Sequence, residues 1–189
     1  MKKIILASGS PRRKELLAQI GLSFEVIPSK GEEKITKKDP ARVVEELSAQ
    51  KAEEVAENIA DGIIIGADTV VSQDGLIMGK PADRKDAEKM LKKLEGRSHS
   101  VFTGVMLILK ESGKILKKEN FSVETKVHVY PMSDQDVESY LDMGEYADKA
   151  GAYGIQGAFA AYISGIEGDY NNVVGLPVGA LYQKIKEII

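Results

Sequence analysis

Residues 4–13 read IILASGSPRR, and this stretch sets the pattern for the rest of the chain. Its four leading apolar residues predict a buried strand, and Pro11 is well placed as the first residue of a helix. A helix N-terminus after a tight turn presents backbone N–H groups and partial positive charge. Around this helix N-terminus lie the hydroxyl groups of Ser8 and Ser10 and the guanidinium groups of Arg12 and Arg13. We interpret the stretch as a site for an anion, most simply a phosphate chain.

The same stretch also fits a plain capped helix, with Ser10 as its cap and both arginines in solvent. Cations in a first helical turn oppose the helix dipole by about 0.3–1 kcal/mol each unless an anion neutralises them. Two adjacent arginines at this position therefore favour the anion site.

Charge and composition narrow the chemistry of the chain. Its 189 residues carry a formal net charge of −3, so a bound polyanion is expected to be small and held locally, and no nucleic acid partner is expected. Cysteine is absent and histidine occurs only as His99 and His128, which leaves carboxylates as ligands suited to Mg²⁺ or Mn²⁺. No signal peptide pattern or apolar run of membrane length occurs, so we expect a cytoplasmic protein with no membrane partner.

The stretch 62–71, GIIIGADTVV, is the second informative one. Three consecutive isoleucines predict a strand that is buried on both faces, as in the centre of an α/β sheet. A carboxylate near the end of such a strand is costly to bury unless it is paired or binds a metal. Asp68 could instead cap a turn, but residues 69–71 continue the strand pattern. Asp68 is therefore a candidate ligand or catalytic group.

Apolar periodicity and breaker residues predict the other elements. Helices are expected at 11–20, 39–60 and 83–94, after Ser133 and from Pro177. Strands are expected at 24–27, 76–78, 100–109, 115–130 and 158–163, with a polar loop through Asn171 and Asn172. No repeat or linker divides the sequence, so we expect a single domain over residues 1–189.

Two lysines and one glutamine are further candidates. Lys51 lies in the predicted helix 39–60, and Lys80 lies between a glycine and a proline that hold its backbone. Either lysine could reach a phosphate, or be an ordinary surface lysine. The glycine-rich run 148–157 has neither helical nor strand periodicity and could wrap a base, whose edge Gln156 can hydrogen-bond.

Five motifs follow one another along the chain: SGSPRR at 8–13, GADT at 66–69, GKP at 79–81, KAGAYGIQG at 149–157 and VGLP at 174–177. In order and spacing they resemble the Maf family of nucleoside triphosphate pyrophosphatases, over nearly the whole chain. The resemblance implies an α/β fold with a mixed twisted sheet flanked by helices and two lobes around a central cleft, similar to inosine triphosphate pyrophosphatases. It also implies a homodimer, and metal-dependent hydrolysis of a nucleoside triphosphate to the monophosphate and pyrophosphate.

The resemblance also assigns roles to residues. Asp68 matches the proton acceptor, and Glu33 and Asp68 match the ligands of a divalent cation, Mg²⁺ or Mn²⁺. Residues matching the substrate site are Ser8, Ser10, Arg12, Arg13, Lys51, Thr69, Lys80 and Gln156. Of these, Arg12, Thr69 and Gln156 match positions tied to base choice in the branch that prefers dTTP and UTP. The family often has Asp-Glu where this chain has Glu32-Glu33, so the choice between these two glutamates stays open.

Two other functions stay open at this point. One is a house-cleaning pyrophosphatase for non-canonical purine triphosphates, and the other is a nucleotide-binding regulator of septum formation without turnover. Asp68, Lys51 and Lys80 favour an enzyme, because a pure binding protein has no need for a carboxylate aimed at an anion.

Overall fold

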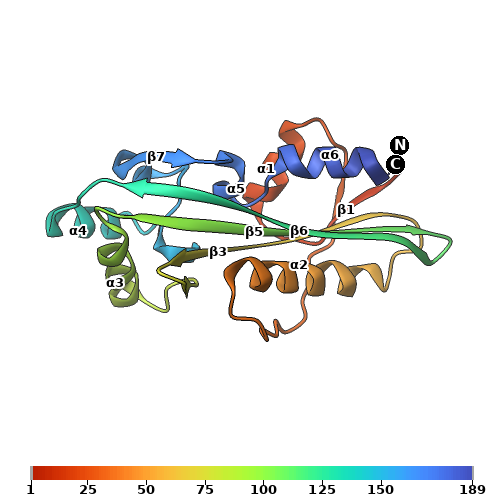
Figure 1. Cartoon of the computed structure of the whole chain (residues 1–189), viewed down its shortest axis with the longest axis horizontal. Coiled ribbons are helices and arrows are strands. Elements are labelled where there is room, and N and C mark those ends of the chain that lie inside the picture. The colour runs from red at the N-terminus through yellow and green to blue at the C-terminus, as the bar shows by residue number, and fades with distance from the viewer. Residues whose placement is uncertain (1, 189) are drawn as a thin grey trace. The chain divides into compact units, whose positions relative to one another are not determined.

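A mixed β-sheet is the framework of the computed structural model, which describes residues 2–188 (Figure 1). Its strands are β1 (Ile4–Leu6), β2 (Glu25–Val26), β3 (Gly62–Gln73), β4 (Leu76–Met78), β5 (Ser98–Glu111), β6 (Lys114–Val129) and β7 (Ile163–Glu167). They lie in the order β2-β1-β3-β5-β6-β7, and β4 pairs with β3. Strand β1 runs parallel to β2 and β3, whereas β4 and β7 pair antiparallel to β3 and β6. The expected mixed α/β class is confirmed.

The helices alternate with these strands along the chain. They are α1 (Pro11–Gln19), α2 (Pro40–Ala56), α3 (Arg84–Leu94), α4 (Asp134–Asp142), α5 (Tyr170–Val174) and α6 (Val178–Ile188). Two 3₁₀ turns, η1 (Ala150–Ala152) and η2 (Ala158–Tyr162), occur between α4 and β7.

The chain forms two compact units. The first contains the residues up to Asp68, Thr103–Val123 and the residues from Gly175 onward, and the second contains Thr69–Phe102 and Glu124–Val174. Strands β3, β5 and β6 contribute residues to both. Two units agree with the two expected lobes, whereas the central cleft and the single domain stay predictions.

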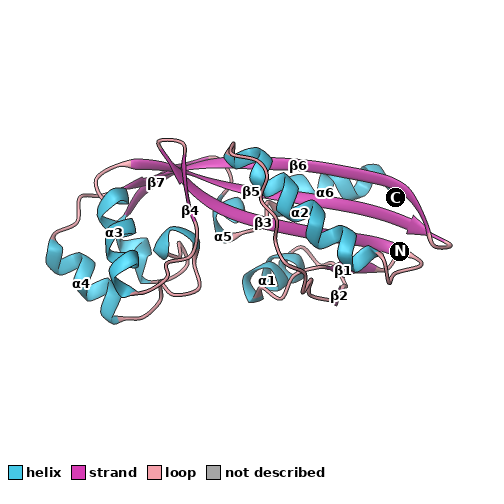
Figure 2. Ribbon diagram, turned by 90° about the horizontal axis from the view of Figure 1, so that it is seen from below, coloured by secondary structure: helices cyan, strands magenta, loops and turns pink. Residues whose placement is uncertain are grey.

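In the first unit, helices cover both faces of the sheet. Helix α2 lies on one face, and α1 and α6 lie on the other (Figures 1 and 2). Beneath α2, apolar side chains from the sheet and the helix form one core: Ile5, Ala7, Ala52, Val55, Ala56, Ile64, Met106 and Ile108. The isoleucine run of β3 is fully buried, as its composition predicts.

Two glycines let the backbone of α2 touch the sheet. A Cβ atom added at Gly66 of β3 would lie 2.2 Å from the carbonyl oxygen of Ser48, and one added at Gly104 of β5 would lie 2.2 Å from that of Val44. Real Cβ atoms do not come this close to backbone atoms, so both positions require glycine at this helix-to-sheet distance.

In the second unit, α3 packs against α4 and η1. The side chain of Asp83 caps α3, and Ser133 and Asp136 form a capping box at the start of α4. The rings of Tyr140, Tyr153 and Phe159 pack together in the core, with centroids 5.1 Å and 4.6 Å apart for the pairs that contain Phe159.

Three sequence predictions are wrong. The predicted strand 158–163 is the 3₁₀ turn η2, in which Phe159 is buried and its neighbour Ala160 is exposed, and β7 begins only at Ile163. The predicted loop at 171–172 contains α5, because the carboxylate of Asp169 accepts a hydrogen bond from the backbone N–H of Asn171 in its first turn. The buried amide of Asn172 donates to the carbonyl of Val101. Helix α2 ends at Ala56 instead of residue 60, since the chain then tightens into i to i+3 hydrogen bonds.

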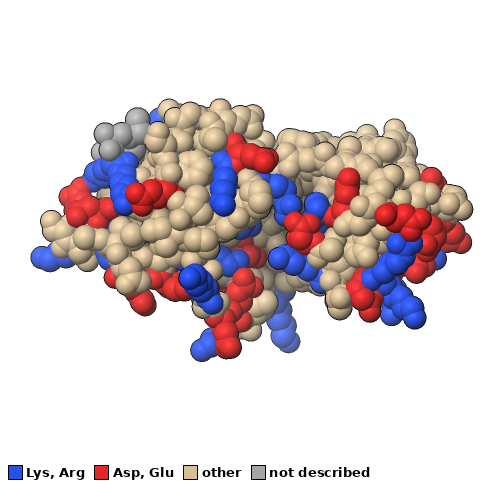
Figure 3. All heavy atoms as spheres, turned by 180° about the vertical axis from the view of Figure 1, so that it is seen from behind, with Lys and Arg blue, Asp and Glu red and all other residues tan. Residues whose placement is uncertain are grey.

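Charged side chains of both signs are interspersed on the face drawn in Figure 3. Many form ion pairs, such as Arg84 with Glu138 and Asp142. Within residues 2–188, no helix combines the length and the apolar character needed to cross a membrane.

Replacing Gly66 with alanine should lower the free energy of unfolding by about 3 kcal/mol, at the upper end of the usual cost of overpacking, because neither the strand nor the helix backbone can yield easily. Urea denaturation would measure the loss. Gly179→Ala is the control: Gly179 lies in α6 with open space around its Cα, so alanine there should raise stability by about 0.5–1 kcal/mol. A Gly66→Ala protein as stable as the wild type would contradict the close approach of α2.

Candidate active site

Strand β3 carries Asp68 toward α2. Side chains alternate between the two faces of a strand, so Ile64, Gly66 and Asp68 share one face. Ile64 belongs to the core beneath α2, and Gly66 touches the helix backbone. Asp68 comes two residues after this contact, and its side chain is only 14% exposed.

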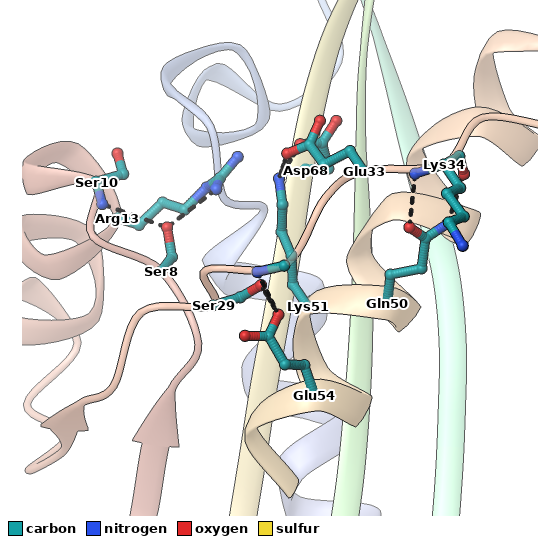
Figure 4. Close-up of polar contacts among 11 residues, drawn as sticks. Ser8, Ser10, Arg13, Ser29, Glu33, Lys34, Gln50, Lys51, Glu54 and Asp68 are labelled. Carbon is teal, nitrogen blue, oxygen red and sulfur yellow. Dashed lines mark hydrogen bonds and ion pairs between the residues drawn. The ribbon is translucent and has the colours of Figure 1, made fainter. Parts of the chain in front are cut away.

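Lys51 of α2 is the partner of Asp68. Its Nζ atom lies 2.5 Å from Oδ1 of Asp68 and 2.9 Å from Oε1 of Glu33. The Lys51 side chain is 17% exposed, so these ion pairs are less screened by water than pairs on an open surface. Figure 4 shows both carboxylates beside the lysine nitrogen. Lys51 is thus paired and largely withdrawn from water, and its contact with a phosphate stays a prediction.

Glu33 comes from an extended loop. Residues 27–38, between β2 and α2, form neither helix nor strand, and the residues from 30 to 39 are all exposed. Of the two adjacent glutamates that the sequence offers, Glu33 is the one whose carboxylate reaches Lys51. Glu33 and Asp68 thus share one partner, the ammonium group of Lys51, which brings the two carboxylates side by side.

The first loop is organised by Ser8 and Arg13. The hydroxyl oxygen of Ser8 accepts hydrogen bonds from the backbone N–H of Ser10 (3.3 Å) and from Nη1 of Arg13 (3.1 Å). Nε of Arg13 donates to the carbonyl oxygen of Gly175 at 2.9 Å. Ser10 occupies the N-cap position of α1, but its side chain makes no capping hydrogen bond. The interpretation of Ser10 as merely a cap is therefore wrong.

Arg13 also lies within electrostatic reach of the carboxylates. Burial is the main cause that lowers the pKa of its guanidinium, and the positive charge of Arg12 lowers it further. The negative charges of Asp68 and Glu33 act in the opposite direction. A guanidinium keeps its proton at neutral pH despite such shifts. The first unit therefore holds two cations, Arg13 and Lys51, near the carboxylates of Glu33 and Asp68.

Three predicted site residues belong to the second unit: Thr69, Lys80 and Gln156. Thr69 follows Asp68 directly on β3, and Lys80 and Gln156 are exposed. The backbone N–H of Gly151 donates to the carbonyl oxygen of Gly79 at 3.0 Å, which ties the glycine-rich run to the residue before Lys80. Gly151 has φ +69°, and a Cβ there would lie 2.9 Å from Val71. This glycine is needed for the connection.

A buried polar pair supports the glycine-rich run from within. Nε2 of His99, on β5, lies 2.7 Å from the hydroxyl of Tyr153, and His99 is 4% exposed. Burial lowers the pKa of His99 to about 4, and His128 contributes a smaller effect in the same direction. His99 is therefore neutral at physiological pH.

Sequence reasoning missed the side chains that hold the loop with Glu33 and the glycine-rich run with Gln156. In the first unit, Glu46, Gln50 and Glu54 of α2 contact the backbone of the Glu33-bearing loop. Their spacing of four residues is a visible signal, since it places them on one helix face. In the second unit, Glu145 accepts a hydrogen bond from the backbone of Ala158 at 3.0 Å, close to Gln156. No sequence signal marks Glu145.

The carboxylates of Glu33 and Asp68 form a donor set that suits a hard divalent cation. Both already point at one positively charged atom, Nζ of Lys51. Within the described part of the chain, no group of three or more histidine, aspartate or glutamate side chains gathers in a metal-binding arrangement. Two carboxylates are enough for Mg²⁺ when phosphate oxygens and water complete its shell. The residues present therefore fit such a cation together with a phosphorylated substrate.

Comparison with known proteins identifies the family of the chain. The sequence profile of the family described as Maf-like protein matches residues 3–188. The chain belongs to the Maf family. All five motifs that carry the resemblance lie within the matched residues.

Several curated relatives of this Maf chain are named dTTP/UTP pyrophosphatase. The protein from Agathobacter rectalis is 49% identical over 100% of this chain and 98% of its own length. The protein from Carboxydothermus hydrogenoformans is 50% identical over 98% of each chain, and one from Bacillus cereus is 44% identical over 99% of this chain and 90% of its own. Among solved structures, a HAM1 protein from Coxiella burnetii aligns with a TM-score of 0.47 and 18% identity over 68% of this chain and 73% of its own.

The buried histidine of this Maf chain should make stability depend on pH. Because the pKa of His99 is about 4 when folded and 6.5 in a model compound, the unfolded chain takes up the proton first. The neutral His99 side chain therefore contributes to the free energy of unfolding in full above pH 6.5. This contribution, about 3 kcal/mol, is lost as the pH falls to 4. Urea denaturation at pH 7 and pH 4.5 should show this loss in the wild type and a smaller one in His99→Gln.

His128→Gln is the control for this measurement. Its ring pairs with the exposed carboxylate of Glu167 and is itself partly exposed, and it contributes only the smaller part of the His99 shift, so this variant should keep most of the steep pH dependence of the wild type. Equal slopes for the wild type and His99→Gln would contradict the assignment to His99.

Proposed function

We propose that this chain is a nucleoside triphosphate pyrophosphatase that acts on dTTP and UTP. The products are the nucleoside monophosphate and pyrophosphate. Membership of the Maf family and the relatives named dTTP/UTP pyrophosphatase, at 44–50% identity over nearly whole chains, support this proposal.

The observation that carries the proposal is the cluster of Lys51, Glu33 and Asp68. A carboxylate that is largely withdrawn from water and held in place by an ammonium group can orient a water molecule and accept its proton. In the proposed reaction, the oxygen of this water forms a bond to the α-phosphorus while the bond to the bridging oxygen breaks. Asp68 takes the proton from the water, and pyrophosphate leaves with the bonding electrons.

The cations of the first unit stabilise the charge that develops on the phosphates. Arg13 is held by Ser8 and by the carbonyl of Gly175, so its position is fixed before the substrate binds. Lys51 is held in the same way by its two carboxylate partners. Such preorganised charges lower a barrier without having to reorganise during the reaction. Ser8 and Ser10 complete the proposed triphosphate site beside them.

A divalent cation, Mg²⁺ or Mn²⁺, held by Glu33 and Asp68 would neutralise phosphate charge and make the attacking water more acidic. The two carboxylates must then bind both this cation and the ammonium group of Lys51. They can do so because each carboxylate oxygen can accept more than one partner.

For the second unit we propose roles in substrate binding. Gln156 and Thr69, together with Arg12, read the base, and Lys80 binds a phosphate. The support for Gln156 is its exposed position in a loop that Glu145 and Tyr153 hold. The homodimer that the resemblance implies stays a prediction.

Product analysis tests the proposed reaction. With dTTP and Mg²⁺ or Mn²⁺, the wild type should release dTMP and intact pyrophosphate, as separated by ion-exchange chromatography. Asp68→Asn should fold normally and lose more than about 100-fold in kcat, because it removes the charge that accepts the proton while keeping the shape. Release of orthophosphate as the first product, or near-normal turnover by folded Asp68→Asn, would contradict the proposal.

Replacing Gln156 with alanine should weaken base discrimination more than it lowers the best rate. A polar group that a bound base removes from water and leaves unpaired costs about 1–3 kcal/mol, so dTTP and UTP should exceed CTP and purine triphosphates by roughly 10- to 100-fold in kcat/KM. Steady-state rates across the common triphosphates would measure this ratio. An alanine variant with the full preference would show that other residues read the base.

A further inference from the structure

The loop that carries Glu33 is held to α2 almost entirely by polar contacts. We call residues 28–38 the Glu33 loop. From residue 30 to its end it is exposed, so burial of apolar side chains does not fix its position. Besides Lys51, which pairs with Glu33, three side chains of α2 contact it: Glu46, Gln50 and Glu54. Residues spaced by four lie on one face of a helix, and here that face is turned to the loop.

Glu54 holds the start of the Glu33 loop. Its carboxylate accepts hydrogen bonds from the hydroxyl of Ser29 and from the backbone N–H groups of Lys30 (2.8 Å) and Gly31 (3.0 Å). These bonds lower the pKa of Glu54, the one from Ser29 most strongly. A Cβ added at Gly31 would lie 2.9 Å from Oε2 of Glu54, so the backbone approaches the carboxylate closely.

Gln50 holds the loop on the other side of Glu33. Its Oε1 accepts from the backbone N–H of Lys34 at 3.0 Å, and its Nε2 donates to the backbone carbonyl of Lys34 at 2.6 Å. The side-chain amide thus pairs with one residue through both groups, as a neighbouring strand would. Figure 4 shows this pair beside the Glu33 carboxylate. Two simultaneous bonds fix the direction of the backbone as well as its distance.

Glu46 anchors the far end of the loop, at Thr36 and Lys37. Glu33 therefore lies between two anchors, two residues after Gly31 and one residue before Lys34. Lys51 leaves α2 next to Gln50 in the sequence and reaches Glu33 directly. One helix thus supplies both the cation that meets Glu33 and the anchors that aim it.

We propose that Gln50 and Glu54 are positioning residues that hold the Glu33 carboxylate beside Asp68 and thereby set the affinity of the site for a divalent cation. This inference rests on the proposed function of Glu33 and Asp68. Without the anchors, an exposed loop samples many conformations, and binding of the cation must then also order the loop.

The test compares four substitutions in α2. Glu54→Met and Gln50→Met keep side-chain length and helix propensity but remove the hydrogen bonds to the loop. Glu53→Met is the matched control, because Glu53 is the adjacent carboxylate on the same helix and pairs with Lys118 of β6 instead of the loop. Glu54→Gln is a conservative variant that retains one acceptor oxygen.

Two measurements that do not need turnover are made on each full-length protein. Hydrogen exchange followed by mass spectrometry reports the amides of residues 30–37. Electron paramagnetic resonance of free Mn²⁺ reports binding of Mn²⁺ alone. Both Met variants of the anchors should exchange these amides faster and bind Mn²⁺ about 5- to 30-fold more weakly, the factor expected from losing one or two net hydrogen bonds. Glu53→Met should match the wild type, and Glu54→Gln should fall between.

Kinetics then separate positioning from general damage. With the anchors removed, the Mn²⁺ concentration needed for half-maximal rate should rise by the same factor, while kcat at saturating Mn²⁺ stays near the wild-type value. Faster loop exchange with unchanged Mn²⁺ affinity would overturn the inference and leave the anchors a purely structural role. A loss in Glu53→Met equal to that in Glu54→Met would overturn it too.

Glu33→Gln distinguishes this inference from the proposed function. If Glu33→Gln binds Mn²⁺ as the wild type does, Glu33 is no ligand, and both the cation placement and the inference fail. If Glu33→Gln loses Mn²⁺ binding but the anchor variants do not, the proposed function stands and the inference alone is overturned.

Discussion

The contact between the backbone of α2 and the two central strands is the constraint on which the first unit depends. At Gly66 and Gly104, carbonyl oxygens of the helix occupy the space in which a side chain would begin. A helix is a rigid rod, so fixing it at Val44 and Ser48 also fixes the residues that follow. The same contact that closes the core therefore sets the distance from Lys51 to Asp68.

Charge in the site is organised before any ligand is bound. Each ion is held by a specific partner: Lys51 by two carboxylates, and Arg13 by a hydroxyl and a carbonyl oxygen. Groups that are already oriented replace the hydration that these ions lose, which is the physical basis of electrostatic preorganisation. In a chain with a net charge of −3, Arg13 and Lys51 are thus two cations whose positions are fixed beside the carboxylates of Glu33 and Asp68.

The sequence predicts the elements whose signal is local. The buried isoleucine run of β3 and the starts of α2 and α3 near residues 39 and 83 all form as expected. The pairing of Lys51 could not be foreseen, because it depends on how closely α2 approaches the sheet. The η2 turn was mistaken for a strand because AFAAY is apolar without a clear period. The partners of Glu46, Gln50 and Glu54 were missed because peptide groups in a loop leave no pattern in the sequence.

Anchoring through the backbone has a consequence for how the Glu33 loop can change during evolution. Most groups that α2 binds in this loop are peptide N–H and C=O groups, which are present whatever side chain a residue carries. Proline is the exception, since it has no N–H to donate. Side chains such as Lys30, Glu32 and Ile35 can therefore drift freely without moving Glu33. The loop can therefore acquire new surface chemistry around Glu33 while its path along the helix stays the same.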